Sequence, residues 1–401
     1  MSASFLIRHA CPAGLPWPVV VAWIVALGWL GRVVPAAFGL RRVPNLLLPE
    51  YDQVPAGEPT LTVVVPARNE QPNVAACLGS LLAQDYPHCR ILAVDDRSTD
   101  ATGSIMDALA AEHPDRLRVL HITELRPGWL GKTNALALAA AAAETDYLLF
   151  TDADVLFRAD SVRRSLAYAV ATGADHLVTL PTTILRRWDE GMVLGLFQTF
   201  SLWGARPWKI ADPRARMDSI GIGSFNLLRR AAYLQIGGLE PQRLDVLEDI
   251  TLGRRVKRAG LRQRIAFGRG LANVHWASGA FGLVEVMTKN IFSAFRFHIS
   301  LALGACIWLL LFFVAPLPAL CFAAVRVPAG IAVACTVWGY MLLRPTSGIP
   351  ARNGLLAPVA GLLFTYTLLR SMVTTLRQGG VVWRGTFYPL AELRKHSTPL
   401  L

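Results

Sequence analysis

The chain has 401 residues, of which 53% are hydrophobic and 17% charged, and its 32 Gly and 25 Pro residues follow no period. This composition excludes a disordered or collagen-like polypeptide. The net charge is +12, and residues 1–56 and 299–401 hold 12 basic but only 3 acidic residues. Most of the positive excess therefore flanks apolar segments, which indicates membrane anchoring and argues against nucleic-acid binding.

The first expected element is a membrane helix. The stretch from His9 to Gly31 contains no Asp, Glu, Lys or Arg, and it reaches the roughly 20 residues that cross a bilayer. We interpret it as an uncleaved anchor rather than a signal peptide, because no small-residue cleavage site precedes Arg32, Arg41 and Arg42. These arginines are expected on the cytoplasmic side. Residues 1–56 are therefore predicted to form an N-terminal membrane anchor and linker.

Between residues 57 and 298, short apolar strands alternate with helices. The expected strands are Leu61–Val65, Ile91–Val94, Arg118–Ile122 and Tyr147–Thr151. The first expected helix begins near Val74. Three more are expected at Thr102–Glu112, Thr133–Ala143 and Ser161–Ala171. This alternation predicts an α/β domain around a mainly parallel sheet. Ligands of such sheets bind beyond the carboxyl ends of the strands.

Acidic side chains follow two of these strands. Asp95 and Asp96 come at the end of the second strand, and Asp152 and Asp154 follow the fourth. A single acidic pair after a strand is usually a turn signal, but carboxylates clustered on one sheet edge repel one another. A divalent cation relieves that repulsion, and oxygen ligands suit Mg²⁺ or Mn²⁺. The sequence therefore predicts a divalent metal site at this edge of the sheet.

Two further segments of the domain carry candidate chemistry. The sequence Gly221-x-Gly223-x-x-Asn226 lacks the third glycine of the dinucleotide fingerprint, and no P-loop occurs, so a Rossmann dehydrogenase and a P-loop ATPase are disfavoured. Glu248 and Asp249 precede an amphipathic helical pattern. An aspartate at that position is either an ordinary helix cap or a reactive carboxylate.

The second apolar block runs from Ile299 to Leu369 and is interrupted by three arginines, Arg326, Arg344 and Arg352. Two membrane spans are expected, and a third is left open. The basic tail after Leu369 favours a cytoplasmic C-terminus, whereas an anchor plus three full spans places it outside. Either Leu355–Leu369 is re-entrant or interfacial, or the charge rule fails. Residues 299–401 are thus predicted to be transmembrane helices and a basic tail.

Five motifs, taken in order, resemble those of family 2 glycosyltransferases, which have a GT-A fold. They read T-V-V-V-P-A-R-N-E, A-V-D-D-R-S-T-D, G-K-T-N-A-L, F-T-D-A-D-V and L-E-D-I-T-L-G-R-R-V, within about residues 60–265. One of them alone is weak, but five in order are specific. The membrane segments on both sides are further similar to lipid-directed members, the ceramide glucosyltransferase-like and the carotenoid- or hopanoid-associated enzymes.

The resemblance implies a role for each matching residue. Nucleotide-sugar binding is implied for Pro66, Arg68, Asn69, Glu70, Asp95, Asp96, Lys132 and Asp152. Asp154, together with Asp152, would hold Mg²⁺ or Mn²⁺, and Lys132 would lie near the diphosphate. This is physically coherent, because a phosphate-bearing leaving group needs positive charge beside it. Asp249 would be the catalytic base that deprotonates an acceptor hydroxyl.

The acceptor side is less well defined. The candidates are Gly223, Ser224, Glu248, Trp203 and Trp208. The two tryptophans belong to Arg186–Asp212, whose mixed aromatic and basic composition suits a membrane–water interface. A core helix with a basic rim is the alternative. The Q/R-x-x-R-W motif of processive and ceramide-type relatives is absent between His275 and Ile299, which disfavours a polysaccharide polymerase.

These observations predict a multi-pass inner (plasma) membrane protein with a cytoplasmic catalytic domain. It would be an inverting glycosyltransferase that moves a sugar from a nucleotide-diphosphate sugar to a lipid or isoprenoid hydroxyl. A processive polysaccharide synthase and a non-catalytic membrane scaffold that retains the nucleotide-sugar fold are the alternatives. A transporter is disfavoured, because the spans contain almost no polar groups. The six cysteines form no C-x-x-C pair, which fits a reduced cytoplasmic domain.

Overall fold

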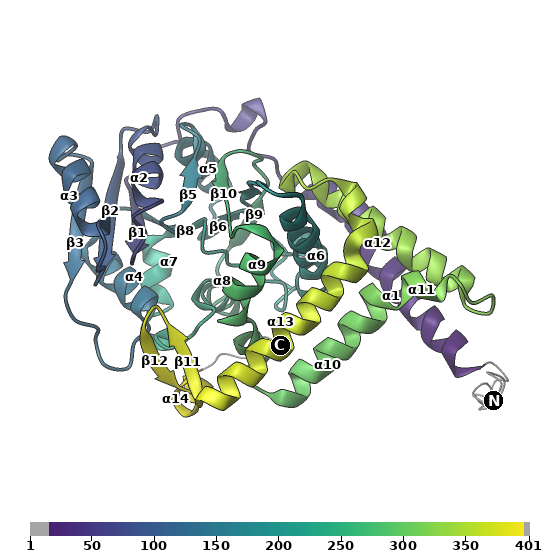
Figure 1. Cartoon of the computed structure of the whole chain (residues 1–401). Helices are drawn as coiled ribbons and strands as arrows, with labels where there is room; N and C mark the ends of the chain where they lie inside the picture. The colour runs from purple at the N-terminus through teal and green to yellow at the C-terminus, as the bar shows by residue number, and fades with distance from the viewer. Residues whose placement is uncertain (1–15, 397–401) are drawn as a thin grey trace.

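A seven-stranded sheet forms the centre of the computed structural model, which describes residues 16–396 (Figure 1). Its strand order is β3-β2-β1-β4-β8-β6-β9. In chain order these strands are β1 Leu61–Ala67, β2 Cys89–Asp96, β3 Leu117–Ile122, β4 Tyr147–Phe150, β6 His176–Thr179, β8 Asn226–Arg229 and β9 Gln263–Ala266. Only β8 runs antiparallel to its neighbours β4 and β6. The prediction of an α/β domain with a mainly parallel sheet is confirmed.

Helices cover both faces of the sheet, which explains why the central strands β1 and β4 are buried along their whole length. On one face, α2 (Val74–Leu82), α3 (Thr102–Glu112) and α5 (Ser161–Ala171) pack against alternate strand residues such as Val63. On the other face, α4 (Gly131–Ala142), α7 (Arg230–Gln235) and α8 (Glu248–Arg258) pack against residues such as Val64. Each valine side chain removed from water in this way contributes about 1.5–3 kcal/mol.

The predicted elements match with small shifts at their ends. The helices α3 and α5 have the predicted bounds. Strand β1 continues past Val65 through Pro66 to Ala67. A proline is tolerated there because β4 has already ended, at the pairing of Val64 with Phe150, and Pro66 is paired only with β2.

A smaller sheet and two more helices lie between the main sheet and the apolar helices. The small sheet contains β5 (Val155–Phe157), β10 (Ala272–Val274) and β7 (Thr182–Thr183). Glu190, at the start of α6 (Trp188–Gly204), is fully buried and accepts backbone hydrogen bonds from Arg186 and from Gly279, at the start of α9 (Gly279–Thr288). This carboxylate joins the two helices that face the apolar segments.

Three segments among the described residues are long and apolar enough to cross a membrane. They are Trp17–Arg42, Arg326–Ser347 and Ala351–Gln378, and they contain the helices α1 (Trp17–Gly39), α12 (Arg326–Ser347) and α13 (Ala357–Gln378). The uncharged stretch that we interpret as an anchor reaches Gly31, and α1 continues beyond it, through Arg32, to Gly39. The predicted start at His9 lies outside the described residues.

A fourth apolar segment precedes α12. Helix α10 (Ile299–Leu309) passes through a π-helical turn (Leu310–Val314) into α11 (Pro316–Ala319). Such a turn is expected ahead of Pro316 and Pro318, since proline donates no hydrogen bond and displaces the preceding carbonyl. The prolines therefore disturb this segment locally and do not end it at Ala315.

After α13 the chain returns to the α/β domain. A hairpin of β11 (Gly380–Trp383) and β12 (Thr386–Pro389) is followed by α14 (Leu390–His396). Figure 1 shows this hairpin beside the lower end of α4, away from the apolar helices α1 and α12. The hairpin contains the sequence W-R-G-T-F-Y (383–388), which resembles a terminal motif of the lipid-directed members and has no role assigned from the sequence.

Helix α8 crosses the backbone that precedes β8 at very close range. A Cβ atom on Gly253 would lie 1.9 Å from the carbonyl oxygen of Ile220, and one on Gly221 would lie 1.7 Å from that of Asp249. Backbone oxygens cannot rotate away as a side chain can. Glycine at both positions therefore lets α8, which carries Glu248 and Asp249, approach the end of the sheet.

The Gly253→Ala substitution should lower the free energy of unfolding by about 2 kcal/mol or more, because overpacking against backbone forces α8 to shift. Gly79→Ala is the matched control, since Gly79 is also helical and has no atom within 4 Å of a built Cβ. It should be neutral or stabilising by up to about 1 kcal/mol. Thermal unfolding of both purified variants measures the difference, and equal melting temperatures would contradict a tight crossing.

Candidate active site

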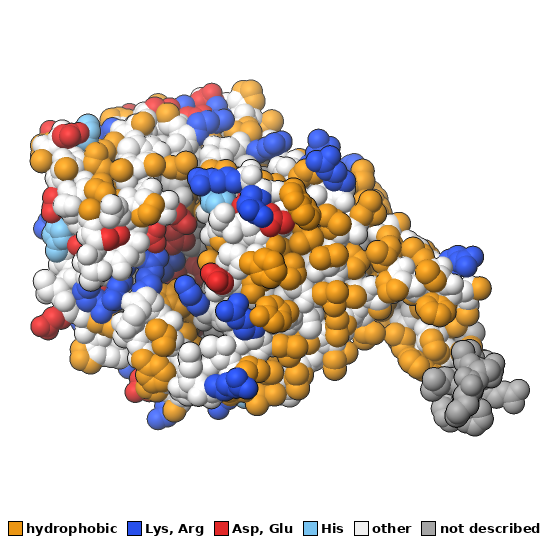
Figure 2. All heavy atoms as spheres, in the orientation of Figure 1, with side chains coloured by type: hydrophobic (Ala, Val, Ile, Leu, Met, Phe, Trp, Pro, Cys, Tyr) orange, Lys and Arg blue, Asp and Glu red, His pale blue; other side chains and the backbone are white. Residues whose placement is uncertain are grey.

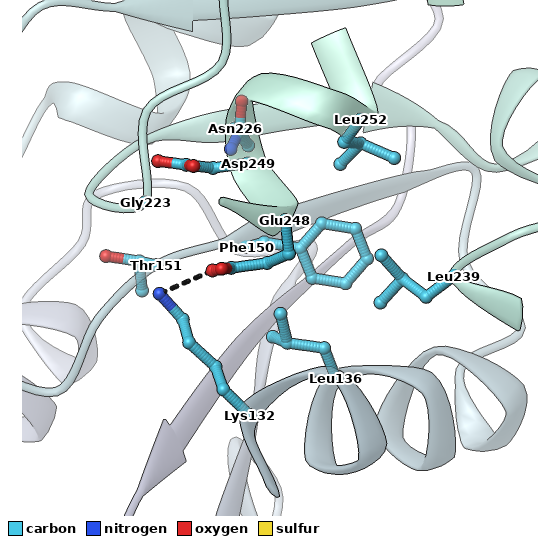
Figure 3. Close-up of a pocket in the computed structure, with 10 residues that line it drawn as sticks. All are labelled: Lys132, Leu136, Phe150, Thr151, Gly223, Asn226, Leu239, Glu248, Asp249 and Leu252. Carbon is cyan, nitrogen blue, oxygen red and sulfur yellow. Dashed lines mark ion pairs between the residues drawn. The ribbon is translucent and has the colours of Figure 1, made fainter. Parts of the chain in front are cut away.

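A pocket opens where the carboxyl end of β4 meets the first turns of α4 and α8 (Figure 3). It is lined by Lys132, Leu136, Phe150, Thr151, Gly223, Asn226, Leu239, Glu248, Asp249 and Leu252. Three of the predicted motifs thus contribute to one cavity, although they are separated by up to about a hundred residues. The pocket has an apolar floor, and its polar groups gather near Lys132.

Lys132 joins the elements of this pocket. Its Nζ lies 2.6 Å from Oδ1 of Asp152, after β4, and 2.7 Å from Oε1 of Glu248, the first residue of α8. Burial alone lowers the pKa of a lysine, but the negative charges of Asp152, Glu248 and Asp249 outweigh it and raise the pKa of Lys132. The lysine is therefore a permanent cation between two carboxylates.

Asp249 is the second residue of α8. Its Oδ1 accepts a hydrogen bond from the backbone N–H of Ile250 at 2.8 Å. Burial, reinforced by the charge of Glu248, raises the pKa of Asp249 to about 7, although Lys132 acts in the opposite direction. Figure 3 shows Asp249 beside Gly223 and Glu248 directed toward Lys132. A carboxylate with this pKa can accept a proton near neutral pH.

The glycine segment before β8 closes the pocket from one side. A Cβ on Gly223 would lie 2.6 Å from Oδ2 of Asp152 and 3.2 Å from Nζ of Lys132. The next residue, Ser224, is buried, and its carbonyl accepts a hydrogen bond from the hydroxyl of Thr151 at 2.8 Å. The predicted acceptor-side residues Gly223 and Ser224 therefore border the Lys132–Asp152 pair.

A buried polar network that the sequence did not indicate holds this segment in place. Nε2 of Gln263 donates to the carbonyls of Ile220 (2.9 Å) and Gly253 (3.0 Å), which belong to the two sides of the tight crossing. Nδ1 of His176 lies 2.8 Å from Nε2 of Gln263. The other ring nitrogen of His176, Nε2, donates to Oδ1 of Asn226 (3.0 Å). Burial lowers the pKa of His176 to about 4, so its ring is neutral. No motif marks Gln263 or His176, because their role depends only on tertiary contacts.

The residues predicted to bind a nucleotide sugar meet at the ends of β1 and β2. Asn69 Oδ1 accepts a hydrogen bond from the backbone of Thr99 at 2.8 Å, which ties the two loops together. Asp95 lies 3.2 Å from Nδ1 of His121, and the buried Asp96 pairs with Arg97 at 2.8 Å. Pro66, Arg68, Asn69, Glu70, Asp95 and Asp96 are thus brought to one edge of the sheet.

Asp154 has the properties of a metal ligand. Its Oδ1 is buried without a hydrogen-bond partner. Burial, with the charges of Asp152 and Glu70, raises the pKa of Asp154 to about 7. Among residues 16–396, no three His, Cys, Asp or Glu side chains form a ready-made metal cage. One or two carboxylates completed by substrate phosphates and water are, however, the usual protein ligands of Mg²⁺, and Asp154 and Asp152 fit that pattern.

Trp203 and Trp208 lie apart from this pocket. Trp203 belongs to an aromatic cluster with Trp29, Trp308 and Phe312, at ring-centroid distances of 5.5, 5.1 and 5.0 Å, which joins α6 to α1 and α10. Trp208 packs against Gly39 at the end of α1. Neither residue lines the pocket around Asp249, and both connect the α/β domain to the apolar helices.

Comparison with known proteins shows what the domain is similar to. Residues 62–237 match the family described as glycosyl transferase family 2. The 4,4'-diaponeurosporenoate glycosyltransferase of Staphylococcus aureus is 24% identical over 341 residues, which cover 83% of this chain and 89% of that protein. The family match and the strand topology give the domain the GT-A fold that the sequence implied.

Two solved structures are also similar. The mannosyltransferase PcManGT from Pyrobaculum calidifontis, in complex with GDP-Man and Mn²⁺, has 20% identity and a TM-score of 0.49, and covers 89% of this chain and 99% of its own. TarS 1–349 of Staphylococcus aureus, in complex with UDP-GlcNAc, has 16% identity and a TM-score of 0.42, and covers 82% of this chain and 95% of its own.

The Lys132→Met substitution should destabilise the domain by about 1–3 kcal/mol, because it leaves two shielded carboxylates without their cation. Lys209→Met is the matched control, since Lys209 is exposed and lies 3.5 Å from Asp212 in a surface pair. That change should cost less than about 0.5 kcal/mol. Thermal unfolding of the purified variants distinguishes them, and a K132M protein as stable as K209M would show that the pocket does not depend on the lysine.

Proposed function

We propose that this chain, whose residues 62–237 match glycosyl transferase family 2, transfers a sugar from a nucleotide-diphosphate sugar to a lipid or isoprenoid hydroxyl, with inversion at the anomeric carbon. The observation that carries the proposal is the pocket in which Asp249, with a pKa of about 7, lies beside a permanently charged Lys132. One group can accept a proton and the other can offset the charge of a leaving diphosphate.

The donor occupies the edge of the sheet formed by the loops after β1 and β2. Asp95 and Asp96 hold its nucleoside, and the first turn of α4, with Lys132, faces its diphosphate, because helix N-termini favour anions. Asp154 and Asp152 hold a divalent cation, Mg²⁺ or Mn²⁺. When bound, such a cation supplies positive charge to the phosphates.

Asp249 acts on the acceptor. It removes the proton of the acceptor hydroxyl while that oxygen forms a bond to the anomeric carbon, on the face opposite the leaving group. The bond between this carbon and the diphosphate oxygen breaks, and its electron pair leaves with the nucleoside diphosphate. Gly223, Ser224 and Glu248 border the space for the acceptor. Gly223 has no side chain to fill this space. Any larger residue there would place a Cβ in contact with both Asp152 and Lys132.

An apolar acceptor is supported by the helices that pack against the domain. Trp203 and Trp208 lie where α6 and the following turn meet α1 and α10, so they are placed to guide a lipid from the membrane. The name of the Staphylococcus aureus relative denotes a carotenoid carboxylate as its acceptor. A carboxylate acceptor is therefore the second candidate, and it differs chemically because it is already deprotonated at neutral pH.

The hairpin after α13 supports a membrane topology. Arg384, in the hairpin, contacts the β1 loop, so the tail lies on the same side of the membrane as the domain. The chain must then cross the membrane an even number of times between these parts. Ile299–Ala319, about 31 Å long at 1.5 Å per residue, and α12 provide two crossings. Helix α13, which packs against α10 as well as α6 and α9, then does not cross the membrane completely.

This topology corresponds to the first of the two alternatives stated from the sequence, in which Leu355–Leu369 is re-entrant or interfacial. It assigns residues 1–56 to the anchor and linker, 57–298 to the catalytic domain, and 299–401 to the C-terminal membrane helices and tail. The domain is cytoplasmic, because Arg41 and Arg42 at the inner end of α1 follow the positive-inside tendency.

The Asp249→Asn substitution should reduce transfer by about 10²- to 10⁴-fold, the usual contribution of a positioned base. Membranes containing each variant are incubated with a panel of radiolabelled nucleotide sugars and Mg²⁺, and the label in extracted lipid is counted. Asp115→Asn, at an exposed aspartate, should leave transfer unchanged. Label in polymer would favour the processive synthase. Absence of Asp249-dependent label from every donor would support the non-catalytic scaffold and refute the proposal.

The rate of transfer should rise with pH through about 7 and level off above it, because Asp249 must be deprotonated to act as the base and its pKa is raised to about 7. The pH dependence of kcat/KM for the acceptor measures this. A carboxylate acceptor needs no base, so it predicts a rate independent of pH near 7 and a D249N variant that remains active. These two results together would contradict a hydroxyl acceptor and support a carboxylate acceptor.

A further inference from the structure

The C-terminal hairpin ends in a tight turn that holds one arginine over the α/β domain. Trp383 pairs with Thr386 across the turn, and the two residues between them, Arg384 and Gly385, have φ values of +46° and +79°. Two-residue turns with positive φ at both positions match the twist of a hairpin. The arginine side chain is thereby fixed at the tip of a rigid element.

Arg384 contacts the loop after β1 with two hydrogen bonds. Nη1 donates to the carbonyl oxygen of Arg68 at 2.7 Å, and Nη2 donates to the Glu70 carboxylate at 2.8 Å. Both partners belong to the motif assigned to the donor. The contact joins positions that are more than 300 residues apart in the sequence, so no local pattern indicates it.

Tyr388, on the second strand of the hairpin, lies over the other half of the donor edge. It is buried, and its hydroxyl accepts a hydrogen bond from the backbone of Gly131, the first residue of α4. Asp96 and Arg97 are close enough to shift the pKa of Tyr388, in opposite directions. Tyr388 and Val381 also pack with Leu130, and this apolar contact fixes the hairpin on the domain.

The hairpin adds positive charge to an edge that already has an unpaired donor. Burial lowers the pKa of Arg68, and Arg97 and Arg384 lower it further. Nε of Arg68 is buried without a hydrogen-bond partner. Figure 2 shows basic and acidic side chains side by side in a hollow of this face, next to the region where Figure 1 draws β11 and β12. An anionic ligand at this edge would face Arg68, since Arg97 and Arg384 are already paired with Asp96 and Glu70.

We propose that the C-terminal hairpin is a wall of the donor site and that Arg384 is a positioning residue for the nucleotide diphosphate. Resting on the function proposed above, this inference assigns the terminal motif to donor binding. Arg384 acts through Arg68 and Glu70: its two hydrogen bonds hold the β1 loop so that the guanidinium of Arg68 faces the anion. Tyr388 sets the distance between that loop and the start of α4.

This arrangement also connects the donor site to the membrane. Helix α13 ends at Gly379, with φ +68°, and the chain passes directly into β11. A displacement of α13 is therefore transmitted to the hairpin without an intervening linker. Donor affinity should consequently depend on residues at the end of the chain that touch neither the pocket nor Asp249.

The test compares Arg384→Gln with Lys395→Gln, which removes one positive charge from an exposed position on the neighbouring α14. Purified protein is titrated calorimetrically with UDP, GDP, TDP and ADP, each with Mg²⁺, and kinetics are measured with the donor that supports transfer. R384Q should weaken nucleotide binding and raise the donor KM about 10-fold, the effect expected for charge-assisted hydrogen bonds. Its kcat and acceptor KM should change less than about 2-fold, and Arg384→Lys should recover part of the affinity.

The outcomes separate this inference from the function on which it rests. Wild-type protein that binds none of the nucleotides refutes the proposed donor itself. Wild-type protein that binds one of them, while R384Q binds it equally well or K395Q loses as much affinity, overturns the role of Arg384 alone.

A second variant tests the same contact from the domain side. Glu70→Gln removes the ion pair without altering the hairpin. Combined with R384Q, it should weaken nucleotide binding little more than R384Q alone, because R384Q already removes the ion pair with Glu70. Additive losses would show that Arg384 does not act through Glu70 and would overturn the proposal, even if R384Q by itself disturbs the fold of the hairpin.

Discussion

The ion pairs of Lys132 are the interaction on which the pocket depends. One ammonium group lies between Asp152, at the end of β4, and Glu248, at the start of α8. Without this cation, the carboxylates at the end of β4 and at the start of α8 would repel one another in a partly buried space. Its position also sets the chemistry of the neighbouring Asp249, whose pKa is raised by burial and by Glu248 but restrained by the lysine.

The geometry around this cation is set by close backbone contacts. Gly221 and Gly253 let α8 approach the segment before β8, and Gln263 joins the two sides of the crossing through carbonyl oxygens. Backbone contacts of this kind position a carboxylate more firmly than surface ion pairs, which gain little in water. The sheet therefore holds the glycine segment in place, and the glycine segment in turn holds α8, which carries the proposed base.

The apolar helices form the other side of the molecule, and they are joined to the domain at two places. An aromatic cluster around Trp203 connects α6 to α1 and α10, and the hairpin after α13 reaches the loop at Arg68. A lipid acceptor and a charged donor would thus meet at Asp249 from opposite environments, one apolar and one polar. In the proposed topology, the contact of the hairpin with the β1 loop keeps the tail on the same side of the membrane as the domain.

The sequence by itself determined the α/β class, the helices Thr102–Glu112 and Ser161–Ala171, and the polar residues at the strand ends, because periodicity and strand-end motifs are local properties. The uncharged stretch that marks the first apolar helix stops at Gly31, whereas the helix continues to Gly39, since one arginine does not end a helix whose neighbours remain apolar. Only the tertiary structure decided that Lys132 pairs with Asp152 and Glu248, that Gln263 supports the glycine segment, and that Arg384 contacts Glu70. These contacts join residues far apart in the chain, and their energy depends on distances that no local pattern encodes.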